Sequence, residues 1–154
     1  MIIVLCIILT TFWFAATVAV DFLAIPAVFR TIPDVMLAGE VGMKVFSRFN
    51  YIELICATGL LLLAWFSPKG SKKILLIVSI LLIFIASFYT FYLTPKIIEL
   101  TRLMNHAHQG VITGLEDFNK EHESYHNFYV KMDSVKLFIL LGLDVFLVMK
   151  KDKV

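Results

Sequence analysis

Charged residues are scarce in this chain of 154 residues. They make up 17% of it, while apolar residues make up 60% and the mean hydropathy is +0.87. A soluble domain is typically about 25% charged and about 45–50% apolar, so the composition argues against an ordinary cytosolic enzyme. The 7 glycines and 4 prolines exclude a collagen-like or low-complexity chain, and we identify no internal repeat. A net charge of +2 is too small to indicate nucleic acid as a partner.

Long apolar stretches, by contrast, take up most of the sequence. A helix crosses the hydrocarbon core of a bilayer with about 20 mostly apolar residues, and four stretches qualify: residues 1–21, 51–66, 74–93 and 131–149. The fourth carries Asp133, Lys136 and Asp144, so the other three must shield it from lipid. We therefore predict an all-α polytopic membrane protein, a single membrane domain over residues 1–154 with four transmembrane helices in an antiparallel bundle.

The distribution of lysine predicts the orientation of these spans. The segments after the second and fourth spans are basic and hold a single acid between them: Lys69, Lys72, Lys73, Lys150, Lys151, Asp152 and Lys153. Short basic segments stay in the cytoplasm, so we expect both termini inside and the protein in the bacterial cytoplasmic membrane. Residues 1–21 lack the basic start and the cleavage site of a secretory signal, so we expect this helix to be retained.

The first of the two outer connections, residues 22–50, shows a helix signal. Thr31 can cap a helix that has Pro33 in its first turn and Asp34 as an early acid. The residues that follow, 36–49, are amphipathic. We therefore expect an amphipathic helix here, and the alternative is a segment that lies at the membrane surface and merely connects two spans.

The second outer connection, residues 94–130, has two helix signals. Thr94 and Pro95 resemble the start of an amphipathic helix that ends near Gly110. From Leu115, residues with helical spacing lead without a break into the fourth span: Phe118, His122, Tyr125, Tyr129 and Met132. We expect one long helix that projects beyond the bilayer.

The two cysteines and four histidines predict little chemistry. Cys6 and Cys56 lie at depths that differ by roughly 13 Å, too far for a disulfide, so we expect both to be packing residues. His122 and His126 share a helix face, and with Glu123 they match the pattern H-E-x-x-H of zinc proteases. The candidate metal ligands are His106, His108, His122 and His126. A solvated polar face is the favoured interpretation, binding of a divalent or transition metal is second, and protease activity is last.

Polar residues within the predicted helices form inward stripes. At 100° per residue, Asp133, Lys136 and Asp144 fall on one face of the fourth helix. With the predicted topology, a polar cluster gathers at the outer end of the bundle from Asp21, Arg30, Arg48, Asn50, Glu53, Asp133 and Lys136. We expect its acids and bases nearly to balance. Three interpretations stay open: a structural ion-pair network, an outward-facing pocket for an ion or small solute, and a proton relay through Glu53 or Asp144.

Several short motifs resemble the transmembrane-protein-205-like family. They are Asp21-Phe22, Pro26, Phe29-Arg30, Ala38-Gly39, Phe46, Phe49-Asn50 and Pro95. The resemblance implies a small four-helix membrane protein with a domain of unknown function, distantly similar to copper-resistance membrane proteins. Many members have a histidine where this chain reads Lys131-Met132-Asp133-Ser134-Val135-Lys136. The resemblance therefore implies the fold and the polar cluster, and supplies no reaction.

These observations favour a small integral membrane protein that is not an enzyme and has no cofactor. We expect an accessory or self-associating bundle, with the lipid bilayer and a homo-oligomer or larger membrane complex as its partners. Gly39 and Gly42 suit close helix packing. The alternative function is transport or handling of a metal ion or small solute through an outward-facing polar pocket.

Overall fold

The computed structural model describes residues 1–108 and 113–151, and all regular structure within them is helical. The elements in chain order are α1 (Ile2–Ala19), η1 (Val20–Ala24), α2 (Ile25–Thr31), α3 (Val35–Trp65), α4 (Lys69–Phe88), η2 (Tyr89–Leu93), α5 (Thr94–His108) and α6 (Leu115–Lys151). The elements η1 and η2 are single π-helical turns. The all-α prediction is confirmed.

Each π-helical turn joins two α-helices into one continuous rod. Ile2–Thr31 runs without a break through η1, and Lys69–His108 runs without a break through η2. In both rods a proline, Pro26 or Pro95, stands two residues after the π-helical turn. Proline has no N–H for the carbonyl four residues earlier, and the wider turn lets the helix continue past that gap. The predicted helix start at Thr94 coincides with the first residue of α5, but α5 continues the preceding helix through η2 and does not begin a separate one. The predicted stop at Gly110 lies outside the described residues.

Asp34, and not Thr31, starts the third helix. Its side chain accepts hydrogen bonds from the backbone N–H groups of Met36 at 2.8 Å and Leu37 at 3.2 Å. Thr31 instead ends α2, and Ile32 after it is extended. The predicted amphipathic segment 36–49 is helical, but it is the first half of α3 and continues into the second apolar stretch. The prediction of one long final helix from Leu115 is confirmed by the 37 residues of α6.

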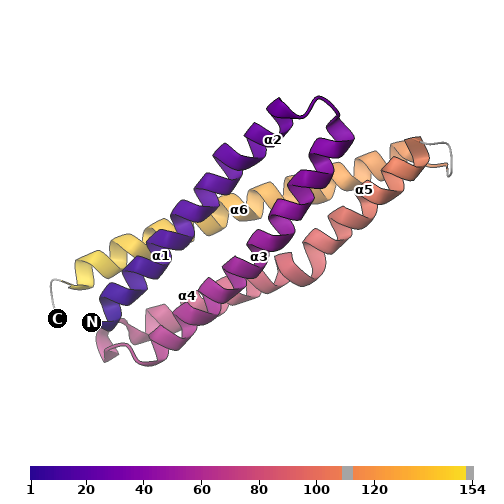
Figure 1. The fold of residues 1–154 in the computed structure, drawn as a ribbon. Helices are drawn as coiled ribbons and strands as arrows, with labels where there is room; N and C mark the ends of the chain where they lie inside the picture. Colours follow the sequence, from indigo (N-terminus) through magenta and orange to yellow (C-terminus); the bar gives the residue numbers. More distant parts are fainter. Residues whose placement is uncertain (109–112, 152–154) are drawn as a thin grey trace.

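The long helices lie side by side, and the start of α1 and the end of α6 lie at the same end of the molecule (Figure 1). We call this end, with the turn between α3 and α4, the base, and the opposite end, with the turn between α2 and α3, the tip. The two halves of the chain share one order of elements, α1–η1–α2–α3 and α4–η2–α5–α6, although the sequence showed no repeat. In the packing, α1 contacts α3 and α6, while α3 contacts α4 and α5 contacts α6.

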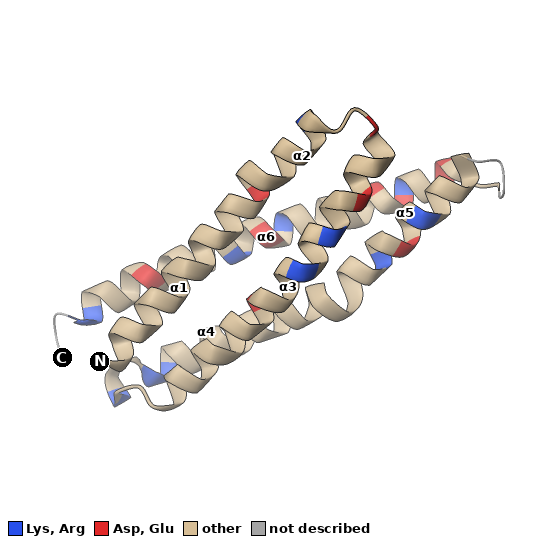
Figure 2. Cartoon of the chain, viewed as in Figure 1, with Lys and Arg blue, Asp and Glu red and all other residues tan. Residues whose placement is uncertain are grey.

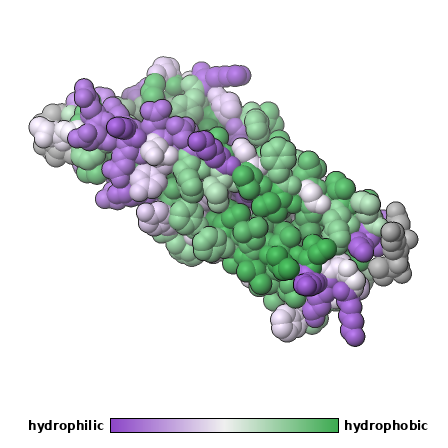
Figure 3. Space-filling model, turned by 180° about the vertical axis from the view of Figure 1, so that it is seen from behind, coloured by the Kyte–Doolittle hydropathy of each residue, from purple (hydrophilic) through white to green (hydrophobic). Residues whose placement is uncertain are grey.

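Apolar side chains fill the base half of the bundle and also cover its outside. The core there includes Trp13, Leu60, Leu82 and Leu140, each at most 1% exposed. Large apolar side chains also face outward, and Phe138 is 75% exposed. Figure 3 shows the result on one face, a broad hydrophobic band between two hydrophilic ends. Such an exposed band is expected of a surface that meets lipid.

Three of the described helices are long and apolar enough to cross a membrane: Ile2–Thr31, Val35–Trp65 and Lys69–His108. With 30, 31 and 40 residues, they are about 45–60 Å long at 1.5 Å per residue. The hydrocarbon core is about 30 Å thick, so each helix extends well past it. Helix α6 packs against these helices. It carries Asp133, Lys136 and Asp144, the charged residues that were predicted to need shielding from lipid, and Asp133 and Lys136 are buried.

Candidate functional site: a buried polar cluster

A polar cluster lies near the middle of all four long rods. Its centre is the ammonium group of Lys136 on α6, which forms ion pairs with Glu53 of α3 and with Asp133, one helical turn before it on α6. Lys136 is 1% exposed, Glu53 is 0% exposed and Asp133 is 5% exposed. The structure therefore brings together three of the residues that the sequence predicted to meet, and it buries them away from solvent.

Helix α1 completes the surroundings of Glu53. The indole N–H of Trp13 donates a hydrogen bond to Glu53 Oε1 at 2.9 Å, and the hydroxyl of Thr17 donates to the same oxygen at 3.3 Å. The two donors are four residues apart, so they lie on the same face of α1. That face points into the bundle, and both side chains are buried. Within the described residues, Glu53 Oε2 is buried and has no hydrogen-bond partner.

A second layer of hydrogen bonds centres on Asn50, one turn before Glu53 on α3. Its amide nitrogen donates to Thr94 Oγ1 at 2.6 Å, and the hydroxyl of Tyr129 donates to its Oδ1 at 3.3 Å. The hydroxyl of Thr90 donates to the backbone carbonyl of Asn50 at 3.3 Å. These contacts join α3 to η2, α5 and α6, so the two layers together connect all four rods.

Two stacked tyrosines link the layers. The ring of Tyr89 lies 5.2 Å from the nitrogen of Lys136, a cation–π contact, and stacks on Tyr129 with 4.6 Å between ring centroids. The hydroxyl of Tyr89 is buried and has no hydrogen-bond partner among the described residues. Neither tyrosine was expected in the cluster from the sequence, because both fit equally well on an apolar helix face.

Asp21 sits beside the cluster in η1. It is close enough for the charges of Asp133, Lys136 and Glu53 to act on it, and it is partly exposed. Arg30 and Arg48 are exposed, and neither forms an ion pair with these acids within residues 1–108 and 113–151. The cluster therefore holds three carboxyl groups and one ammonium group, without either arginine.

A separate polar contact lies nearer the base. Asp144 of α6 accepts hydrogen bonds from the hydroxyls of Thr10 and Thr11 on α1, the second at 3.1 Å. Thr10 also contacts the backbone carbonyl of Cys6 at 2.8 Å. This contact fixes α1 against α6 within the apolar half of the bundle, two turns from Lys136.

The histidines lie apart from the cluster, toward the tip. His122 and His126 stack on α6 with ring centroids 6.2 Å apart, and His106 and His108 are in the last turn of α5. Burial, and then the neighbouring charge of His126, lower the pKa of His122 below its ordinary value of 6.5. Within the described residues, no group of three or more histidine, cysteine or acidic side chains has the geometry to hold a metal.

The two cysteines, Cys6 and Cys56, are buried and free, in agreement with the predicted lack of a disulfide. Both belong to the apolar core of the base half.

Comparison with known proteins identifies a family to which this chain is similar. Neither the curated proteins nor the solved structures provide a match. Residues 8–106 match the family model described as domain of unknown function DUF4149, a region that contains Trp13, Thr17, Asn50 and Glu53 from the cluster and ends before α6. The chain therefore belongs to the DUF4149 family of uncharacterised proteins.

Proposed function

We propose that the protein is a non-enzymatic, four-helix integral membrane bundle that acts as an accessory or self-associating membrane component. The observation that carries this proposal is the burial of the polar cluster between all four rods. Taking a charged side chain out of water costs several kcal/mol unless it is paired. Mutual pairing of Glu53, Asp133 and Lys136 offsets this cost only when the helices meet in one register, so the cluster selects that register.

The distribution of lysines along the bundle supports one orientation of the protein in the membrane. Lys69 at the start of α4 and Lys150 and Lys151 at the end of α6 share the base, where Figure 2 shows basic residues on both helices. Basic segments favour the cytoplasmic side, so the base faces the cytoplasm, both termini are inside, and the rods cross a bacterial cytoplasmic membrane in antiparallel order. The motifs around Asp21 and Pro26 further support a kinship with the transmembrane-protein-205-like family.

A second candidate function is the handling of a cation or small polar solute. Two observations favour it: the unpartnered oxygens of Glu53 and Tyr89, and the excess of carboxyl groups around Lys136. A cation or a hydrogen-bond donor bound at either oxygen would satisfy it. In this function Glu53 and Tyr89 supply the binding atoms, and the histidines take no part.

The experiment that separates the two functions is elemental analysis of gently purified protein together with its detergent-corrected mass from light scattering. The structural function predicts no stoichiometric metal and a mass that is a defined multiple of the chain or includes a partner. A stoichiometric metal that Glu53→Gln removes while the protein stays folded would favour the second function. A metal-free particle with the mass of a single chain would contradict self-association and any stable complex.

A further inference from the structure

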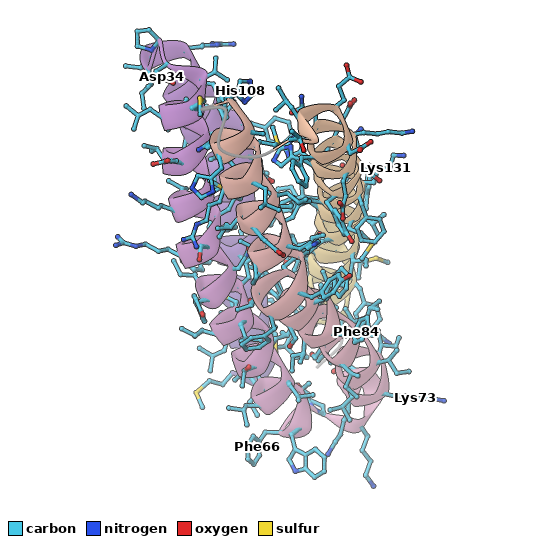
Figure 4. All side chains as sticks on the ribbon, turned by 90° about the vertical axis from the view of Figure 1, so that its right-hand side faces the viewer. Asp34, Phe66, Lys73, Phe84, His108 and Lys131 are labelled. Atoms are coloured by element: carbon cyan, nitrogen blue, oxygen red, sulfur yellow. The ribbon has the colours of Figure 1, made fainter. Side chains whose placement is uncertain are left out.

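A groove lies between α3 and α5 in the tip half, apart from the buried cluster. Its volume is about 370 Å³, and half-buried Met43, Ser47, Ile98 and Asn105 line its floor. Figure 4 shows the two ends of these helices: Asp34 at the start of α3 and His108 at the end of α5 share the tip, while Phe66 and Lys73 are at the base.

Three basic side chains line this groove. They are Lys44 and Arg48 of α3 and Arg102 of α5, all exposed, with Glu40 as the acid among the lining residues. None of the three bases forms an ion pair within residues 1–108 and 113–151. Figure 2 shows basic residues on both helices in this region. Unpaired bases from two helices that converge on one groove create a site with a net positive charge.

The position of the groove relative to the membrane limits what can bind there. Arg48 lies three residues, about 4.5 Å, beyond Tyr51, where the apolar half of α3 starts. The headgroup layer on each side of a bilayer is about 5–8 Å thick, so Arg48 lies at its depth. Long side chains such as those of Lys44 and Arg102 can bend toward this layer from farther out.

An apolar path leads from the groove into the membrane. Ile55 is seven residues after Arg48 on the same face of α3, and it is 71% exposed. Tyr51 lies between them and is 54% exposed. An acyl chain along this stripe would bring the attached phosphate to the guanidinium of Arg48, which binds phosphate with two parallel hydrogen bonds.

We propose that the groove between α3 and α5 binds the phosphate of an anionic phospholipid, with Arg48 and Arg102 as its principal ligands. This inference depends on the proposed insertion in the membrane and adds a ligand at a second place in the fold. It also gives a role to Arg48, which the buried cluster does not use.

The test is native mass spectrometry of the detergent-purified protein with added phosphatidylglycerol or phosphatidylcholine of identical acyl chains. The wild type is expected to retain phosphatidylglycerol preferentially. The double variant Arg48→Gln/Arg102→Gln is expected to lose at least about tenfold in retention, because a charge-assisted hydrogen bond is worth that much or more. Equal retention of the two lipids by the wild type, or unchanged retention by the double variant, would overturn the proposal.

Two surface variants provide controls in which misfolding is not a concern. Arg30→Gln removes an exposed arginine of α2 that does not line the groove, and it should leave retention unchanged. Glu40→Gln removes the acid from the groove and should increase the retention of phosphatidylglycerol, a change opposite in sign to that of the double variant. Loss of retention in Glu40→Gln would contradict the electrostatic argument.

The source of the phosphate is tested in the same experiment. Inorganic phosphate at millimolar concentration should not displace phosphatidylglycerol, because it lacks the acyl chains that contact α3. Complete displacement would overturn the lipid proposal in favour of a site for free phosphate. Resistance of the protein to alkaline extraction from membranes measures insertion separately, so failure of lipid binding and failure of the proposed function can be told apart.

Discussion

Replacing Lys136 by methionine would test how far the buried cluster stabilises the bundle. Methionine keeps the unbranched chain that packs beside Tyr89 but removes the ammonium group paired with both Glu53 and Asp133. Two carboxylates then remain buried with no cation between them. Removal of one partner from a buried pair typically destabilises a protein by about 3–5 kcal/mol. We expect a loss in this range, since Lys136 is 1% exposed and no water can replace its charge.

The assay is reversible unfolding in mixed micelles, followed by circular dichroism, from which the free energy of unfolding is obtained. Lys131→Met is the matched control, because Lys131 lies on the same helix, is exposed, and forms no ion pair among the described residues. Its substitution should change the free energy by less than about 0.5 kcal/mol. If Lys136→Met were no less stable than Lys131→Met, the cluster would not stabilise the bundle and the reasoning would be refuted.

Three further predictions follow from contacts elsewhere. Gly42→Ala should be neutral or stabilising by up to about 1 kcal/mol, because the added Cβ would lie 3.6 Å from the ring of Phe29, an ordinary contact distance. Gly42→Leu should destabilise the protein by about 1–3 kcal/mol in the same unfolding assay, because the larger side chain does not fit there. Thr10→Val should cost about 1–3 kcal/mol by removing a hydrogen bond to Asp144, and Thr58→Val, on an exposed hydroxyl of α3, serves as its control. The pKa of His122 is lowered in the folded protein, so the unfolded chain protonates this histidine first as the pH falls below about 6.5. The free energy of unfolding should therefore decrease as the pH falls from about 6.5 to the folded-state pKa of His122. His126→Gln should raise the pKa of His122, as followed by NMR titration.

The meeting of Asn50, Glu53, Asp133 and Lys136 could be predicted from the sequence, because ionisable residues in apolar helices have to pair. Trp13 and Thr17 could also have been included, since they lie on the inward stripe of α1 that leads to Asp21 in η1. Tyr89 and Tyr129 gave no such signal. Their part in the cluster depends on which faces of α4 and α6 meet, and this follows only from the packing of the whole bundle.

The direction of Arg48 and the continuity of the helix at Pro95 could not be predicted from the sequence pattern. Arg48 is close to Glu53 in sequence, but five residues turn an α-helix by about 140° relative to its starting direction. Arg48 therefore points away from the cluster and into the groove with Arg102. Thr94 and Pro95 indicate the start of a helix, yet the π-helical turn before them keeps the rod continuous. Such turns have no known signature in a single sequence, so the length of the rods could not be predicted.

The free energy of unfolding of the triple variant Glu53→Gln/Asp133→Asn/Lys136→Met tests the structural role of the cluster most directly. The variant removes every charge of the ion-pair network while retaining the shapes and the acceptors for Trp13 and Thr17. If the cluster is a structural network, the triple variant should unfold within about 1 kcal/mol of the wild type, because neutral residues of similar size often replace a buried ion pair without loss. A triple variant as unstable as Lys136→Met alone would contradict this account.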